Sequence, residues 1–271
     1  MSRVVVVGSI NIDTILNVKK HPAVGETVSA TSSGSAPGGK GSNQAVAAAT
    51  AGARVSLVSA VGHDGDRYIR HLEASGVNTE HVARHGEVQT GAAVVIVSED
   101  GDNSIITSPG ANACLTQVDL STIGLEPGDV VVVQFELPYE TVLSAMRYAA
   151  RVGATIILNP SPWREDAVEA LSMADIVIVN EIEAAALTVG LAEGALVTTL
   201  GPRGATWRNL HVQPPAITAI DTTGAGDSFA GTLAGAIAAG RGMEQALEAA
   251  VLAATEACAS PGAQTWRAES R

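Results

Sequence analysis

The sequence predicts an α/β protein with a doubly wound, mainly parallel sheet, helices on both of its faces and a small β-lid. Short β-branched runs alternate with Ala-rich helical stretches, which is the rhythm of βαβ units. Hydrophobic residues make up 46% of the 271 residues but aromatic residues only 3%, as expected for Val- and Ile-rich strands under Ala-rich helices. Two stretches, 13–37 and 88–109, break this rhythm with polar–apolar alternation and turn residues. We expect one domain, 1–271, in which these stretches pair as the lid.

The first half of the chain supports this element by element. Arg3–Ile10 is a β-branched run broken only by Gly8 and Ser9, and it predicts a central parallel strand. Ser42–Ala53 predicts a helix that stops at Gly52, because glycine readily takes the left-handed conformation that ends helices. The next segments are predicted as a strand at 54–62, a helix capped by Asp64 and running to Leu72, and a hairpin at 90–108 that turns at Asp100-Gly101.

The second half alternates regularly between strands and helices, and two helices close the chain. This order favours a sheet covered on both faces. The predicted strands lie at 130–135, 155–158, 176–179 and 195–200, the helices between them begin near Pro138, Arg164 and Glu181, and the closing helices span 226–240 and 243–259.

Charge and composition exclude several function classes. Lys and Arg total 16 against 28 Asp and Glu, a net charge of −12, so binding to nucleic acid or to an anionic membrane is not expected. No apolar run approaches the ~20 residues of a membrane span, and the chain enters a strand without a signal peptide, which predicts a cytoplasmic protein. Cys114 and Cys258 lie far apart without metal-ligand spacing, as expected for thiols in a reducing compartment.

The stretch GSAPGGKGSNQ, residues 34–44, is close to a phosphate-binding P-loop but departs from it. Gly41 stands where a P-loop needs Ser or Thr for magnesium, and the preceding residues are polar instead of a buried strand. The stretch is then either a Gly-rich turn entering a helix or half of a ligand site. Asn11 and Asp13, at the carboxyl end of the first strand, favour the ligand site, because Lys40 and Asn43 would complete a set of groups suited to a polyol.

The stretch AIDTTGAGDSFAG, residues 219–231, carries the group best suited to catalysis. Its glycines let the amides of Gly224, Ala225 and Gly226 point outward at the start of a helix, and we call these three amides the anion hole. Asp227 beside them could take a proton from a hydroxyl that attacks a phosphoryl group. The alternative is that Asp227 only caps the helix. The spacing leaves both open, whereas a dinucleotide site is excluded because G-x-G-x-x-G is absent.

The motifs GSINID, GGKGSNQAVAAA and DTTGAGDSFAG, in this order, resemble those of the ribokinase-like (PfkB) carbohydrate kinases. The resemblance covers about residues 3–265, and PAVGETV at 22–28 points to the branch that phosphorylates ribose. It implies that Asp227 is the catalytic base and that Gly224, Ala225 and Gly226 hold the transferring phosphoryl group. The sugar contacts that it implies are Asn11, Asp13, Gly39, Lys40, Asn43, Glu136 and Asp227.

The same resemblance implies ATP as phosphate donor, with Mg²⁺ and a potassium-type ion as cofactors. The implied nucleotide-binding residues are Asn180, Thr199, Gly201, Gly204, Gly226 and Val251. Glu183 is implicated indirectly in placing Mg²⁺. The implied ligands of the monovalent cation are Asp221, Thr223, Ala257, Ser260 and Gly262. The lid is expected both to cover the sugar and to form a homodimer.

Two departures from the family pattern keep alternatives open. First, residues 180–194 leave room for only one helix, predicted at 181–189, where the family pattern has an additional helix. Second, Trp266 stands where the family pattern has a hydroxyl residue. The nucleotide and cation sites are therefore less well supported than the sugar site. The alternatives are the same chemistry on deoxyribose, fructose or a nucleoside such as adenosine, or a sugar-binding relative without turnover.

Overall fold

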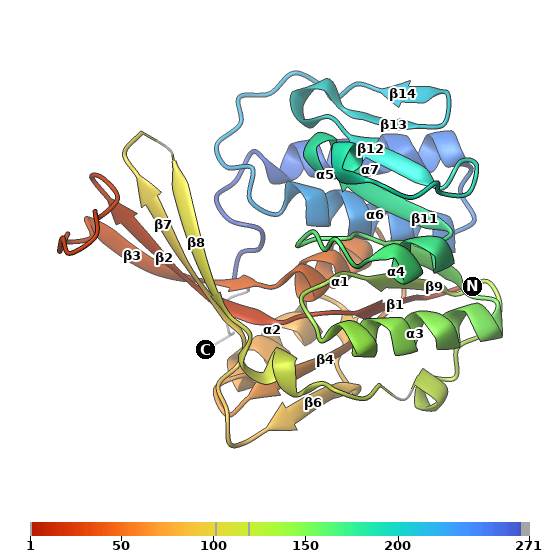
Figure 1. The fold of residues 1–271 in the computed structure, drawn as a ribbon, viewed down its shortest axis with the longest axis horizontal. Coiled ribbons are helices and arrows are strands. Elements are labelled where there is room, and N and C mark those ends of the chain that lie inside the picture. Colours follow the sequence, from red (N-terminus) through yellow and green to blue (C-terminus); the bar gives the residue numbers. More distant parts are fainter. Residues whose placement is uncertain (1, 101, 119, 267–271) are drawn as a thin grey trace.

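The computed structural model describes residues 2–100, 102–118 and 120–266, which form two sheets and the helices around the larger one (Figure 1). The strands of the larger sheet are β1 (Val4–Val7), β4 (Val55–Gly62), β5 (Val77–Asn78), β6 (Val82–His85), β9 (Val130–Val133), β10 (Thr155–Leu158), β11 (Ile176–Asn180), β12 (Leu196–Thr199), β13 (Ala205–Trp207) and β14 (Leu210–Val212). The smaller sheet consists of β2 (Asn11–Val18), β3 (Ser32–Gly38), β7 (Ala92–Ser98) and β8 (Asn103–Ser108). The helices are α1 (Lys40–Thr50), α2 (Asp66–Ala74), α3 (Tyr139–Val152), α4 (Val168–Met173), α5 (Glu181–Ala186), α6 (Ala225–Ala238) and α7 (Met243–Ala257).

The larger sheet is parallel from β5 to β12 and antiparallel at its β13–β14 edge. Its order is β14-β13-β12-β11-β10-β9-β1-β4-β5, with β6 pairing with β4. This confirms the predicted doubly wound, mainly parallel fold. None of the helices in the described ranges has the length and apolarity needed to cross a membrane.

The all-valine strand β1 shows why the sheet is buried on both faces. Val4 and Val6 pack into the core formed with α1, α2, α6 and α7, whereas Val5 and Val7 pack into the opposite core formed with α3 and α4. Side chains alternate between the two faces of a strand, so a strand covered on both sides must be apolar throughout. The carboxyl end of β1 leads directly into the smaller sheet and so places Asn11 and Asp13 at the edge where the sheets meet.

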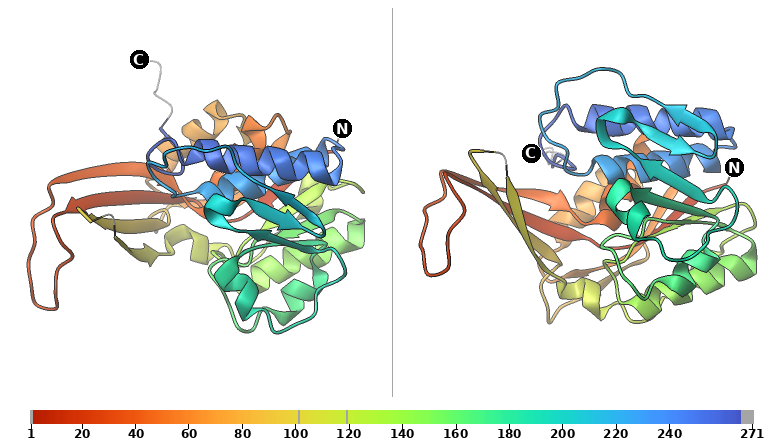
Figure 2. Two further views of the ribbon diagram at one scale, coloured as in Figure 1. Left: turned by 90° about the horizontal axis from the view of Figure 1, so that it is seen from above. Right: turned by 45° about the horizontal axis from the view of Figure 1, so that its top comes forward.

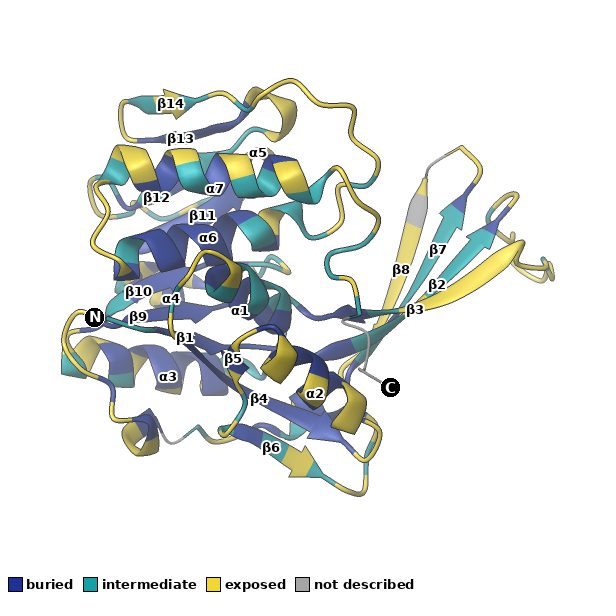
Figure 3. Ribbon diagram, turned by 180° about the vertical axis from the view of Figure 1, so that it is seen from behind, coloured by how far each residue is buried: buried dark blue, intermediate teal, exposed yellow. Residues whose placement is uncertain are grey.

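The smaller sheet is the predicted lid, and from here the lid means β2, β3, β7 and β8. β2 pairs with β3 antiparallel and with β7 parallel, while β7 and β8 form the predicted hairpin, of which Gly101 lies outside the described residues. The lid extends to one side of the larger sheet (Figure 2), and it is more exposed than the central strands (Figure 3). The two stretches that break the βαβ rhythm therefore do pair in space.

Three predicted helix boundaries are wrong, each for a local reason. Asp64 does not cap α2, because its Oδ1 accepts hydrogen bonds from the amide and the hydroxyl of Thr90, both at 2.7 Å, and Gly65 holds the cap position. The helix predicted from Arg164 begins at Val168, after Arg164 has turned back to pair with Asp166. The helix predicted at 181–189 ends at Ala186, because the residues that follow adopt extended backbone and pack on the core.

Helices α1 and α6 are in close contact, and we predict that Gly231 permits it. A Cβ atom on Gly231 would lie 2.2 Å from the carbonyl oxygen of Gln44 and 2.7 Å from the Cβ of Ala47. Gly231→Ala should therefore lower the free energy of unfolding by about 1–3 kcal/mol, as overpacking does. Urea denaturation measures this change.

Gly235→Ala on the same helix is the matched control. Its nearest contacts would be at 3.3 Å, so the gain in helix propensity should keep the change within about 1 kcal/mol of zero. Equal stability of the two variants would show that the distance between α1 and α6 is not limited at Gly231.

Candidate active site

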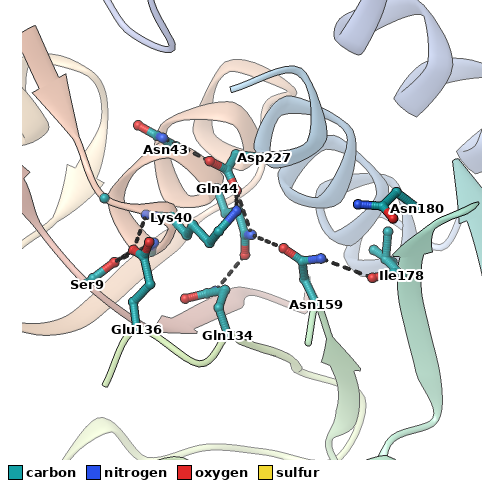
Figure 4. A network of polar contacts seen from close by, with 12 residues as sticks. Ser9, Lys40, Asn43, Gln44, Gln134, Glu136, Asn159, Ile178, Asn180 and Asp227 are labelled. Atoms are coloured by element: carbon teal, nitrogen blue, oxygen red, sulfur yellow. Dashed lines mark hydrogen bonds and ion pairs between the residues drawn. The ribbon is translucent and has the colours of Figure 1, made fainter. Parts of the chain in front are cut away.

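Asp227 lies at the centre of a polar network between α1 and α6 (Figure 4). It is the third residue of α6 and only 5% exposed. Its Oδ2 accepts a hydrogen bond from Asn43 Nδ2 at 2.9 Å, and its Oδ1 accepts one from Gln44 Nε2 at 3.0 Å. Gly224 holds the cap position of α6 without a side-chain cap. The alternative in which Asp227 caps the helix is therefore wrong, and its carboxylate faces α1.

Lys40 places a positive charge next to this carboxylate. Its Nζ lies 4.0 Å from Asp227 Oδ1. The charge of Asp227 raises the pKa of Lys40, with smaller contributions from Glu136 and Glu183, although burial acts in the opposite direction. Lys40 is therefore cationic, and its ammonium can offset negative charge that gathers beside Asp227.

Glu136 joins the end of β1 to the start of α1. Its Oε2 accepts a hydrogen bond from the Lys40 amide at 3.0 Å and another from the hydroxyl of Ser9. A carboxylate at the first turn of a helix is favoured by the positive end of the helix dipole. The structure thus gives Glu136 a role in fixing the entry to α1, and its contact with a sugar stays a prediction.

The lid brings Asn11 and Asp13 to the same edge. Asn11 Oδ1 accepts a hydrogen bond from Asn112 Nδ2 at 2.9 Å, and Asp13 Oδ1 accepts one from the Ala93 amide at 3.2 Å. The Asp13 carboxylate lies directly over Gly38, where a Cβ atom would come within 1.9 Å of Oδ2, and Gly39 has a φ of 89° that favours glycine. Burial raises the pKa of Asp13 to about 6, with Glu136 adding to the rise and the Ala93 amide opposing it.

The anion hole is formed in part. The Ala225 amide donates to the carbonyl of Thr222 at 3.2 Å, so the expectation that all three amides are available is wrong for this one. Within the described ranges, the amides of Gly224 and Gly226 donate to no other protein group. Gly224 has a φ of 77°, and a Cβ atom there would lie 2.3 Å from that of Ala263, so the turn requires glycine. Two amides at the positive end of α6 therefore remain for an anion.

The residues implied in nucleotide binding lie around β11, β12 and α7. Asn180 and Glu183 form a capping box: Asn180 Oδ1 accepts from the Glu183 amide at 2.8 Å, and Glu183 Oε2 accepts from the Asn180 amide at 2.9 Å. Thr199 ends β12, and Gly201 and Gly204 bracket the short turn that follows it, both with positive φ. Val251 is 4% exposed and belongs to the hydrophobic core, so the structure gives it a packing role.

The residues implied in cation binding are partly brought together. Asp221 Oδ1 accepts from the Thr223 amide at 2.9 Å, and Oδ2 accepts from the Gly262 amide at 2.8 Å. Burial alone would raise the pKa of Asp221, but these hydrogen bonds lower it below its ordinary value, so the carboxylate is ionised. The carbonyl of Ala257 accepts from the Ser260 amide at 3.3 Å. A carboxylate next to a turn with backbone carbonyl oxygens is a set of oxygen ligands that fits a monovalent cation.

The motif analysis missed several residues of the network. Gln44 contacts Asp227, Gln134 and Asn159 extend the network from Gln44, and Gln264 Nε2 donates to Asn43 Oδ1 at 2.5 Å. One signal for Gln134 is present in the sequence. It follows four consecutive valines of a predicted central strand, so its polar side chain is expected to be buried. Gln264 has no such signal, because its contact depends on the path of the C-terminal segment.

Comparisons with known proteins match this chain along nearly its whole length. A family profile described as pfkB family carbohydrate kinase matches residues 1–270. Ribokinase of Bacillus subtilis (strain 168) is 36% identical over 280 residues, covering 97% of this chain and 95% of the relative. Deoxyribokinase of Salmonella typhi is 32% identical over 288 residues, covering 97% and 94%. The structure of Arabidopsis thaliana ribokinase complexed with ribose and ATP superposes with a TM-score of 0.86 at 28% identity, covering 97% and 94%.

The raised pKa of Asp13 predicts a pH-dependent cost in stability. Between the ordinary pKa of 3.8 and the folded value of about 6, the folded protein keeps a proton that the unfolded chain has lost. The free energy of unfolding should therefore fall as the pH rises from about 4 to 6, and the cost is fully present above pH 6. Asp13→Asn should remove this cost and be more stable than the wild type by roughly 2–3 kcal/mol at pH 7.

Urea denaturation at pH 4 and at pH 7 measures both proteins. The difference in unfolding free energy between the variant and the wild type should be near zero at pH 4 and largest at pH 7. A difference that is the same at both pH values would mean that Asp13 titrates normally in the folded protein.

Proposed function

The chain belongs to the pfkB family of carbohydrate kinases, and we propose that it transfers the γ-phosphoryl group of ATP to the primary hydroxyl of D-ribose, giving D-ribose 5-phosphate. The observation that carries the proposal is the position of Asp227, buried between Lys40 and the start of α6, with the Gly224 and Gly226 amides at the same helix end. The 36% identity to a ribokinase and the similarity to a ribokinase complexed with ribose and ATP support ribose and ATP as the substrates.

Asp227 acts as the general base. As the sugar's primary oxygen attacks the γ-phosphorus, its proton passes to the Asp227 carboxylate, and the bond from the γ-phosphorus to the bridging oxygen breaks to release ADP. The amides of Gly224 and Gly226 and the Lys40 ammonium are placed to stabilise the negative charge on the phosphoryl oxygens. These groups are fixed by the fold before the reaction, so they need little reorganisation during it.

The sugar lies between the lid and α1 in this proposal. Asn11 would donate to or accept from its hydroxyls and the Asp13 carboxylate would accept from them, while the absence of a side chain at Gly38 leaves room for that carboxylate. Hydroxyl donors favour the ionised form of Asp13 and so offset the cost of burying it. The lid excludes water, which would otherwise compete with the sugar for the phosphoryl group.

ATP would lie along the β11 and β12 ends of the sheet. The side chain of Asn180 uses its Oδ1 in the capping box, which leaves its Nδ2 to donate to a phosphate oxygen. The turn at 201–204 would approach the nucleotide. Mg²⁺ supplies neutralisation of the phosphate charge when bound. Within the described residues no group of three or more His, Cys, Asp or Glu side chains is placed to hold a metal, which fits an ion held mainly by phosphates and water, with Glu183 acting through water.

The turn that contains Asp221 would hold the potassium-type ion. The carboxylate of Asp221 is ionised and accepts from the amides of Thr223 and Gly262. The carbonyls of Ala257 and Ser260 lie at the end of α7 and in the turn after it, to which the Asp221 amide is joined by donating to the Cys258 carbonyl at 3.3 Å. An ion there would fix the segment that precedes the anion hole, because Asp221 lies three residues before Gly224.

Deoxyribose is the second candidate substrate, because the Salmonella typhi relative named deoxyribokinase is 32% identical. Asp13 argues against it. A sugar without the 2-hydroxyl would leave the partly buried Asp13 carboxylate short of a donor, and a desolvated charge without a partner is costly. The network around Asp227 also argues against a sugar-binding relative without turnover, because a pure binder has no use for a base beside an anion hole.

An ADP-release assay over ribose, 2-deoxyribose, fructose and adenosine tests the function. Ribose should have the highest kcat/KM. Asp227→Asn should retain the binding of ribose and ATP, measured by calorimetry, but lose about 10²–10⁴-fold in kcat, since the amide cannot accept the proton.

Two results would overturn parts of the proposal. A higher kcat/KM for 2-deoxyribose would replace ribose as the substrate, and near-normal turnover of Asp227→Asn would remove the base role. Asp166→Asn, on the exposed surface near α4, is the matched control and should keep wild-type activity.

The proposal includes a homodimer formed through the lid. β3 and β8 are the edges of the lid sheet, and β8 exposes Ile105 (57%) and Ile106 (64%). Open strand edges with exposed apolar side chains favour association with another sheet. A second copy of the chain presents the same surface, so a symmetric pair would cover both lids.

Ile106→Lys should weaken this dimer. A charge in an apolar interface is costly to desolvate, so sedimentation equilibrium should give two chains per particle for the wild type and one for the variant at the same micromolar concentration. Ile182→Lys, a substitution at an isoleucine on α5 that is 82% exposed, is the control and should leave the dimer intact. A monomeric wild type would refute the dimer.

A further inference from the structure

Two fully buried glutamines extend the polar network below Asp227 in the view of Figure 4. Gln44 on α1 and Gln134 after β9 are both 0% exposed. Buried side-chain amides are uncommon unless their hydrogen bonds are met, because desolvating them is costly. Neither residue is accounted for by the steps of phosphoryl transfer described above.

Both N–H groups and the oxygen of the Gln44 side-chain amide are hydrogen-bonded. Its Nε2 donates to Asp227 Oδ1 at 3.0 Å and to Asn159 Oδ1 at 3.3 Å, which uses both N–H groups. Its Oε1 accepts from Gln134 Nε2 at 2.5 Å. Asn159 in turn donates to the carbonyl of Ile178 at 3.0 Å, so its oxygen is the end that faces Gln44.

The side-chain amide of Gln134 is held in one orientation, although its oxygen makes no hydrogen bond there with the described residues. Its Oε1 has no hydrogen-bond partner among the described residues and lies over Gly8, where a Cβ atom would be 2.1 Å away. Turning the Gln134 amide over would set its oxygen against the oxygen of Gln44. Turning both amides over would set the Gln44 oxygen against Asp227 and Asn159. Only the observed orientation presents a donor to an ionised Asp227.

We infer that Gln44 is a positioning residue for Asp227 and that Gln134 fixes the orientation of Gln44. The inference rests on the proposed function, in which Asp227 is the base. Gln44 anchors Oδ1 from the buried side, while Oδ2 faces Asn43, which is partly exposed and lies toward the predicted sugar site. The anchored carboxylate then keeps Oδ2 directed at the hydroxyl that it must deprotonate.

Gln44→Met and Gln44→Glu separate the loss of the donor from a change of charge. Gln44→Met removes the donor at similar volume, so kcat should fall about 10–100-fold while KM for ribose and ATP stays within about threefold. Gln44→Glu places a second carboxylate about 3 Å from Asp227, so the acidic limb of the kcat–pH profile should move up by about one pH unit or more.

The other charges around Asp227 stay the same in these variants. Lys40 on α1 faces the carboxylate at 4.0 Å, and Glu136 after β9 and Glu183 on α5 act on the same ammonium. A shift of the pH profile in Gln44→Glu therefore reports the new carboxylate.

Gln134→Met tests the orientation from a residue that does not touch Asp227. The substitution leaves Gln44 Oε1 without its donor and frees the Gln44 amide to turn, so kcat should fall with KM unchanged. Ser59→Ala is the matched control, because Ser59 is likewise 0% exposed and its Oγ has no hydrogen-bond partner within the described ranges. It should keep the wild-type kcat and pH profile.

The outcomes separate this inference from the proposed function. Turnover in Asp227→Asn would overturn the proposed base and the inference with it. An inactive Asp227→Asn together with wild-type kcat and pH profile in folded Gln44 variants would overturn the inference alone. If the Gln44 variants fail to fold, Gln134→Met decides: wild-type kcat overturns the inference, and a lower kcat at unchanged KM supports it.

Discussion

The contact of the Asp227 carboxylate on α6 with the side chains of α1 is the interaction on which the candidate active site depends. A buried carboxylate is tolerated only when it is paired or hydrogen-bonded, and within the described part of the chain the partners of the Asp227 side chain come from α1: Lys40, Asn43 and Gln44. Those partners reach the carboxylate because α1 and α6 approach closely at Gly231. The start of α1 is in turn fixed by Glu136, which accepts from the Lys40 amide. The close packing of α1 against α6 is therefore a requirement of the site, because a wider gap between the two helices would leave the buried Asp227 carboxylate without partners.

The lid adds a second acid, Asp13, which is partly buried and whose ionisation lowers the stability of the fold. Asp13 has few protein donors, and its raised pKa means that ionising it works against folding near neutral pH. A site that keeps such a carboxylate short of donors is complementary to a ligand that brings hydroxyls. The carboxylate of Asp227 is hydrogen-bonded by the protein at both oxygens, whereas Asp13 accepts one backbone hydrogen bond, from Ala93. This difference is what the proposed function uses, with Asp227 as the base and Asp13 as a contact for the sugar.

The sequence predicted the central strands, the lid segments and the meeting of the three motifs, because these depend on local pattern and on where parallel strands end. The family resemblance is confirmed by the match over residues 1–270. The sequence left cap and base open at Asp227, because the two differ by only three residues in the start of α6: a cap at Asp227 requires a helix that begins at Ser228, whereas α6 begins at Ala225. The sequence also could not predict that the Ala225 amide donates to the Thr222 carbonyl or that Gln44 is buried. Both depend on which donor meets which acceptor in three dimensions, and residue spacing carries no such information.

The C-terminal segment departs from the family pattern at Trp266, and the structure gives this residue contacts of its own. Trp266 replaces an expected hydroxyl residue, yet its ring packs on Tyr68 and His71, and its Nε1 donates to the Ser35 carbonyl in β3 of the lid at 2.9 Å. Two residues earlier, Gln264 donates to Asn43, which itself donates to Asp227. The segment therefore joins the lid to α1, the helix whose side chains contact Asp227. Because Ala263 also packs against Gly224, the same few residues lie against the anion hole, so the end of the described chain braces three parts of the site at once.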